Sequence, residues 1–121
     1  MAKFNSFEEI LSWQKARELN LKIYKLTNTN SFYHDNVLKK IRRASVSITS
    51  NITEGFEIET TKEFIRFLYI SKASTGECRS QLFLAYDLEY LEEKEFNEIK
   101  AGLEEISKLL SGLIKYLKST L

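Results

Sequence analysis

The sequence predicts an all-α protein that folds as an up-down-up-down antiparallel four-helix bundle, with helices at about 7–27, 34–54, 61–89 and 93–118. Three observations lead to this fold class. The chain of 121 residues has no proline and only four glycines, so little in it interrupts a helix. Apolar residues recur at helical spacing in all four segments. The connections are short, which favours antiparallel neighbours, and the length fits one domain over 1–121.

A capping box and an apolar stripe predict the first helix. In the box, Ser6 accepts a hydrogen bond from the third helical amide and Glu9 reaches back to the cap. The stripe that follows consists of Trp13, Ala16, Leu19, Ile23 and Leu26. The helix should end in the polar segment 27–31, because Thr, Asn and Ser side chains compete for backbone hydrogen bonds.

A stripe of apolar and small residues predicts the second helix. Its members are Val37, Leu38, Ile41, Ala44, Ser45, Ile48 and Ile52. We expect Gly55 to form the C-terminal cap, because glycine adopts the left-handed conformation without steric cost.

The third helix should begin at a second capping box, formed by Thr60 and Glu63. Its apolar seam has large residues at the ends and small or weakly polar ones in the middle: Phe64, Leu68, Ser71, Thr75, Cys78, Leu82 and Ala85. The seam therefore predicts a close approach by a neighbouring helix.

Glutamates at 92, 93 and 95 suit the positive start of the fourth helix, and lysines at 115 and 118 suit its negative end. Its core stripe is Phe96, Ile99, Leu103, Ile106, Leu110, Leu113 and Leu117. Leu109 and Ile114 widen this stripe, which is typical of bundle packing rather than of a two-stranded coiled coil.

The charge of the chain is nearly balanced, with 18 basic and 17 acidic residues. This balance argues against a uniformly cationic nucleic-acid-binding domain. Residues 1–55 carry nine Lys or Arg against five Asp or Glu, whereas residues 56–121 carry nine against twelve. The single Cys78, the absence of a signal-peptide pattern and the lack of a membrane-length apolar run predict a cytoplasmic protein without a membrane partner.

We expect no catalytic residues, no cofactor and no metal. Di-metal sites in helix bundles need two Glu-x-x-His motifs, and the only histidine is His34. The chain has no glycine-rich phosphate loop and no nucleophile elbow. Cys78 falls on the apolar seam, where a buried, inert thiol is expected. A kinase-substrate pattern at 42–45 and a glycosylation sequon at 51–53 both fall on a regular helix, which suits neither modification.

The candidate functional residues are polar side chains of the second and third helices. Those proposed for a nucleic-acid contact or a protein interface are Lys39, Lys40, Arg42, Arg43, Ser47, Asn51, Glu54 and Glu77. The spacing of Arg43, Ser47, Asn51 and Glu54 places these four in one polar stripe. Two alternatives stay open for Glu77, which either pairs with Arg42 or Arg43 or is solvated on an outward face.

Several of these residues also carry a family resemblance. The pattern Arg42-Arg43-Ala44-Ser45-x-Ser47-Ile48-x-x-Asn51-Ile52-x-Glu54-Gly55, with Lys62-Glu63-Phe64-x-x-Phe67-Leu68, Ser74-x-x-Glu77 and Trp13-x-x-Ala16, resembles the small bacterial proteins encoded in 23S rRNA intervening sequences. The resemblance implies a four-helix bundle that assembles as a homopentamer. It extends to the accessory variability determinants of diversity-generating retroelements, whose basic surface engages nucleic acid and a reverse transcriptase. Glu57 and Glu59 depart from this family, since their loop is commonly basic.

Two functional hypotheses follow. The first is an oligomeric, non-enzymatic protein that associates with RNA or DNA, in which several copies multiply a modest basic patch through avidity. The second is a protein-interaction scaffold whose polar residues fix the oligomer and whose surface recruits a partner such as a reverse transcriptase. The basic N-terminal half favours the first hypothesis and the nearly neutral overall charge favours the second.

Overall fold

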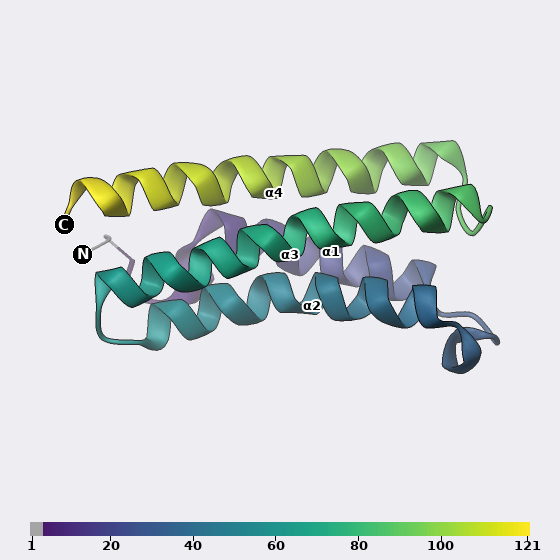
Figure 1. The fold of residues 1–121 in the computed structure, drawn as a ribbon, viewed down its shortest axis with the longest axis horizontal. Coiled ribbons are helices and arrows are strands. Elements are labelled where there is room, and N and C mark those ends of the chain that lie inside the picture. The colour runs from purple at the N-terminus through teal and green to yellow at the C-terminus, as the bar shows by residue number, and fades with distance from the viewer. Residues whose placement is uncertain (1–3) are drawn as a thin grey trace.

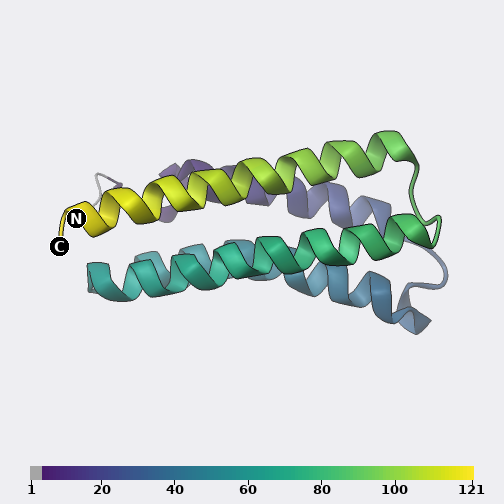
Figure 2. The ribbon, with the colours of Figure 1, turned by 45° about the horizontal axis from the view of Figure 1, so that its top comes forward.

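Four long helices run alternately up and down and form an antiparallel bundle (Figure 1). The computed structural model describes residues 4–121, and its helices are α1 (Leu11–Leu26), α2 (Asn36–Glu57), α3 (Thr61–Asp87) and α4 (Glu93–Ser119). Short 3₁₀ turns, η1 (Phe7–Glu9) and η2 (Phe32–His34), precede α1 and α2. Both α1 and α3 pack against α2 and α4, so the helices occupy the corners of a square (Figure 2). The predicted all-α bundle is confirmed.

The first long helix starts later than the sequence predicts. Residues 7–9 form η1, and Ile10 then adopts an extended conformation with φ −76° and ψ 119°. Ser6 makes no side-chain cap, and Glu9 Oε1 instead accepts from the Asn5 amide at 3.1 Å. The side chain of Ile10 is buried, with 1% of its surface exposed. The helix is therefore interrupted at Ile10, whose apolar side chain enters the core, and the predicted capping box does not form.

Gly55 is not a cap. The second helix continues through it to Glu57, and its φ is not positive. Gly55 is buried against α3, where an added Cβ would lie 2.6 Å from Phe67 Cβ and 3.0 Å from Phe64 Cδ1. The glycine is therefore required by the close approach of two helices, because any side chain at this position overlaps α3.

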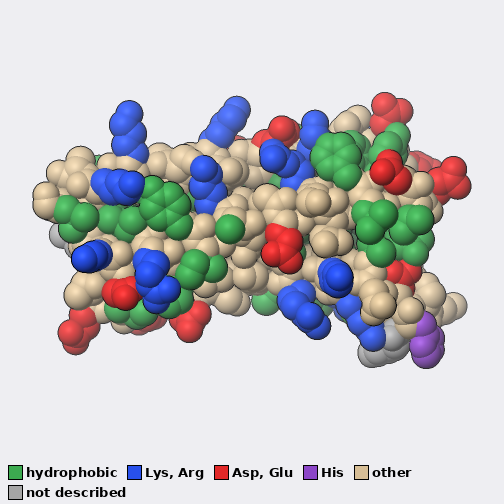
Figure 3. Space-filling view, in the orientation of Figure 1, with side chains coloured by type: hydrophobic (Ala, Val, Ile, Leu, Met, Phe, Trp, Pro, Cys, Tyr) green, Lys and Arg blue, Asp and Glu red, His purple; other side chains and the backbone are tan. Residues whose placement is uncertain are grey.

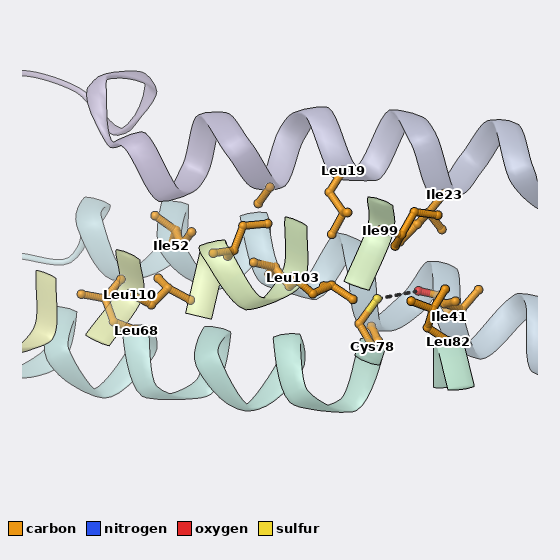
Figure 4. Packing of buried hydrophobic residues seen from close by; sticks show 14 of the residues in the cluster. Leu19, Ile23, Ile41, Ile52, Leu68, Cys78, Leu82, Ile99, Leu103 and Leu110 are labelled. Atoms are coloured by element: carbon orange, nitrogen blue, oxygen red, sulfur yellow. Dashed lines mark hydrogen bonds between the residues drawn. The ribbon is translucent and has the colours of Figure 1, made fainter. Parts of the chain in front are cut away.

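The predicted seam of α3 is confirmed, since all seven of its residues are buried. Its hydroxyl groups find partners, as shown by Ser71 Oγ, which donates to the Ile48 carbonyl of α2 at 2.8 Å. The Cys78 sulfur lies 4.0 Å from the Ile41 carbonyl oxygen (Figure 4). Burial, with a smaller effect from the charge of Glu77, raises the pKa of the Cys78 thiol to about 12. Cys78 is thus a protonated core residue with little thiolate available for reaction.

Apolar side chains of all four helices meet along the bundle axis, as Leu19, Ile52, Leu68 and Leu103 illustrate (Figure 4). The stripe predicted for α4 is confirmed, except that Ile114 takes the place of Leu113 in the core. Ile114 is buried with 4% exposure, whereas Leu113 is only partly buried against the core. The Glu92 amide donates to Glu95 Oε1 at 3.1 Å, which stabilises the acidic start of this helix.

Asp35 joins two connections at one end of the bundle. Its Oδ1 caps α2 by accepting from the amides of Val37 at 2.9 Å and Leu38 at 3.2 Å. Its Oδ2 accepts from the hydroxyl of Tyr90, in the α3–α4 connection, at 2.5 Å. The bond to Tyr90, reinforced by the two amides, lowers the pKa of Asp35, and the same bond raises the pKa of Tyr90.

We expect this bond to stabilise the fold only within a defined pH window. The lowered pKa of Asp35 means that its contribution is lost as the pH falls below about 4, and the raised pKa of Tyr90 means that its contribution is lost as the pH rises above about 10. Thermal unfolding of wild type and Tyr90→Phe from pH 3 to 11 tests this window. The difference in Tm should be largest near neutral pH and shrink at both extremes. A constant difference over the range contradicts the prediction.

Candidate nucleic-acid interface

Arg42 is part of the fold rather than of an open surface. Its Nε donates to Thr27 Oγ1 at 2.6 Å and its Nη2 donates to the Tyr24 carbonyl at 3.1 Å. The guanidinium lies 4.2 Å from the ring centroid of Tyr24 and 3.9 Å from that of Phe32. A cation is favourable at this place, because the carbonyls at the end of α1 carry partial negative charge. Within residues 4–121 Arg42 does not pair with Glu77, and two of its guanidinium nitrogens already donate to Thr27 and Tyr24.

Lys39, Lys40 and Arg43 form a cationic cluster on the outer side of α2, here called the α2 cluster. Lys40 and Arg43 are exposed and Lys39 is partly buried. Within residues 4–121, none of the three forms an ion pair. Lys and Arg side chains are visible over the right-hand part of α2 (Figure 3). Lysine and arginine on a surface without carboxylate partners are suited to phosphate contacts.

The predicted polar stripe of α2 divides into two parts. Ser47 Oγ lies 2.8 Å from Ser74 Oγ of α3, and Asn51 Nδ2 donates to Ser47 Oγ at 2.9 Å and to its carbonyl at 2.8 Å. These two residues are partly buried where α2 meets α3, whereas Arg43 and Glu54 are exposed. The spacing along α2 is as predicted, but Ser47 and Asn51 serve the contact between α2 and α3 rather than an open surface.

Glu77 is exposed on α3, as the solvated alternative requires. In the described part of the chain it forms no ion pair with Arg42 or Arg43. Arg42 is partly buried against the end of α1, whereas Arg43 is exposed, so the two arginines have different environments. The three residues are therefore not one charged cluster.

The structure also shows a groove between α3 and α4 that the sequence reasoning missed. It has a volume of about 280 Å³ and is lined by Tyr69, Lys72, Ser111, Ile114, Lys115 and Lys118. A sequence signal for it existed, because Lys108, Ser111, Lys115 and Lys118 are spaced three, four and three residues apart and share one side of α4. The sequence pattern places Lys115 and Lys118 at the negative end of the helix and does not indicate which residues of α3 they meet.

A larger hollow, of about 860 Å³, lies over α1, where Trp13, Arg17 and Tyr24 are among its lining residues. Among residues 4–121, no group of three or more His, Cys, Asp or Glu side chains could hold a metal ion. No helix of the described chain is long and apolar enough to cross a membrane.

Comparison with known proteins agrees with the fold. The pattern of the family described as 23S rRNA-intervening sequence protein matches residues 8–112. A solved structure, the crystal structure of a protein with unknown function from the S23 ribosomal protein family of Bacteroides thetaiotaomicron VPI-5482, is similar with a TM-score of 0.81 and 28% identity over 87% of this chain and 99% of that chain. No curated protein matches the chain. Neither description indicates a catalytic activity.

Proposed function

Because this chain belongs to the 23S rRNA-intervening sequence protein family, we propose that it is a non-enzymatic, homo-oligomeric protein that associates with nucleic acid. The observation that carries the proposal is the α2 cluster, whose three cations have no carboxylate partner within residues 4–121. Affinity for a nucleic acid grows with the number of phosphates that such cations neutralise, because each contact releases condensed counterions. The expected setting is the cytoplasm of a bacterium.

The homo-oligomer, a pentamer by family resemblance, is supported by the outer side of α3. Large side chains are exposed toward both ends of this helix and small residues lie between them. The large ones are Ile70, Leu84 and Leu88, and the small ones are Ala73 and Ser80. An exposed surface of this kind suits contact with another chain. Several copies would place several α2 clusters on one nucleic acid and increase affinity through avidity.

Fluorescence anisotropy with labelled single-stranded RNA and duplex DNA, between 50 and 200 mM salt, tests the proposal. We expect log K to fall linearly with log salt, and Lys39→Ala/Lys40→Ala/Arg43→Ala to reduce the slope by about 2–3. The matched control is Lys15→Ala/Lys22→Ala/Lys25→Ala on α1, which removes the same charge and should change the slope much less. An absence of binding at 50 mM salt, or an equal loss in both variants, contradicts the proposal.

The second candidate function is a protein-interaction scaffold, favoured by exposed Glu54, Glu57 and Glu59 near the α2–α3 connection, where carboxylates repel phosphate. Its partner would be a protein such as a reverse transcriptase. Light scattering on the protein used for anisotropy separates the two functions. An oligomer that binds neither RNA nor DNA favours the scaffold, and a monomer at micromolar concentration removes the oligomer from both.

A further inference from the structure

The α3–α4 groove is a second cationic surface, built from residues far apart in the sequence. We propose that it is part of the track for a single-stranded nucleic acid, with phosphates on its lysines and unpaired bases stacked on Tyr69 in the groove and on Phe83 farther along α3. This inference rests on the proposed nucleic-acid association and adds to it the form of the nucleic acid and the place where the strand lies.

The walls of the groove carry cations without compensating charge. Of the six described residues that line it, three are lysines and none is a carboxylate. Lys72 comes from α3, and Lys115 and Lys118 come from α4, so both walls contribute. Ser111 adds a hydroxyl that can donate to a phosphate oxygen. This composition is suited to a polyanion that follows the groove between the helices.

An aromatic ring with a lysine beside it lies on α3 at each of two points. Lys118 Nζ donates to the Tyr69 hydroxyl at 2.6 Å and lies 5.0 Å from the ring centroid. Lys100 Nζ lies 5.9 Å from the ring centroid of Phe83. Tyr69 is 45% exposed and Phe83, whose ring packs edge-on against Phe96, is 44% exposed, so bases can reach both residues. Fourteen residues of helix separate the two rings, a distance of about 21 Å along α3. Stacking on such rings needs unpaired bases, which selects a single strand over a duplex.

Folding brings together cations that are far apart in the sequence. Residues 56–121 have more acidic than basic residues, yet five of their nine cations lie where α3 meets α4. Those that line the groove or bridge the two helices are Lys72, Arg79, Lys100, Lys115 and Lys118, whereas Lys108 lies beside Glu104 and Glu105 on α4. Arg79 and Glu104 approach only to 3.9 Å, with side chains 45% and 44% exposed, and such surface pairs are weak. Lys and Arg side chains extend over α4, and Asp and Glu side chains lie both at the ends and in the middle of this face (Figure 3).

The first test is anisotropy with a fluorescein-labelled 12-nucleotide oligouridine and an RNA duplex of the same length. Lys72→Ala/Lys115→Ala should lower oligouridine affinity about tenfold at 100 mM salt and reduce the salt slope by about 1.4, or 0.7 for each lost contact. The control Lys22→Ala/Lys25→Ala removes the same charge from the α1–α4 groove, where Glu95 and Glu98 also lie, and should change affinity less than twofold.

The second test separates stacking from charge. Tyr69→Ala should weaken oligouridine binding about tenfold and leave duplex binding unchanged, whereas Tyr69→Phe, which keeps the ring but loses the hydroxyl, should remain within twofold of wild type. Circular dichroism establishes that each variant is folded. A different outcome is that the groove variants bind oligouridine like their controls while Lys39→Ala/Lys40→Ala/Arg43→Ala loses affinity. That result contradicts the role proposed for the α3–α4 groove and leaves the proposed function standing. If the wild type binds neither probe at 50 mM salt, both are overturned.

Discussion

We expect Gly55→Ala to lower the free energy of unfolding by about 2 kcal/mol, although alanine is the better helix former by about 1 kcal/mol. The added methyl would lie 2.6 Å from Phe67 Cβ and 3.3 Å from the Phe64 carbonyl oxygen. Neither atom is the free end of a flexible side chain, so α2 and α3 must move apart. Separation weakens the hydrogen bonds and packing of the whole seam, and this loss exceeds the gain in helix propensity.

Urea unfolding followed by circular dichroism, at one fixed protein concentration, measures this effect. Gly112→Ala is the matched control, because Gly112 is also inside a helix but an added Cβ there meets nothing within 4 Å. The control should gain about 0.5–1 kcal/mol from helix propensity alone. If both variants gain stability, the close approach at Gly55 is not a constraint on the fold.

The second large effect concerns Arg42. Replacing it with alanine removes two charge-assisted hydrogen bonds and the stacking on two rings, and should cost about 2 kcal/mol of stability. Arg42→Lys should recover only part of this loss, because an ammonium cannot reproduce the planar stack or both hydrogen bonds. Thermal unfolding should show the alanine variant melting about 6–10 °C below wild type.

Arg43→Ala is the control for Arg42, since the neighbouring side chain is exposed and forms no ion pair within residues 4–121. We expect its Tm to stay within about 1 °C of wild type, as for most surface substitutions. Substitution of Arg42 would then lower the stability of the fold, whereas substitution of Arg43 would change the salt-dependent binding of nucleic acid. Equal melting temperatures for the two alanine variants would show that Arg42 does not hold the end of α1.

The helices were predictable because each has its own repeating pattern. The seam that begins at Phe64 and the stripe that begins at Phe96 specify which side of a helix is buried without knowledge of its neighbour. The errors arose where a distant contact decided the outcome. Gly55 suits a cap by local rules, and only the position of Phe67 shows why the helix continues through it. Ile10 similarly interrupts a helix that a local capping box predicts.

The candidate site was less predictable, because its charges are defined by partners far along the chain. Arg42 and Arg43 are adjacent in sequence, yet Arg42 contacts Thr27 and Arg43 faces outward. The α3–α4 groove was missed for a related reason. Lys72 and Lys115 meet only after folding, and the net charge of their half of the chain conceals them. Helical spacing places a residue on a side of its helix but does not identify what that side will meet.

The seam of small residues between α2 and α3 has a consequence for local opening. Ser71, Ser74 and Cys78 let the two helices approach closely, and this contact is the most extensive between any two helices of the described chain. The helices are also consecutive, so their contact needs only a short loop to close. We therefore expect the amide hydrogens of the α2–α3 hairpin to exchange last with solvent and α1, which is shorter and less extensively packed, to detach at lower cost.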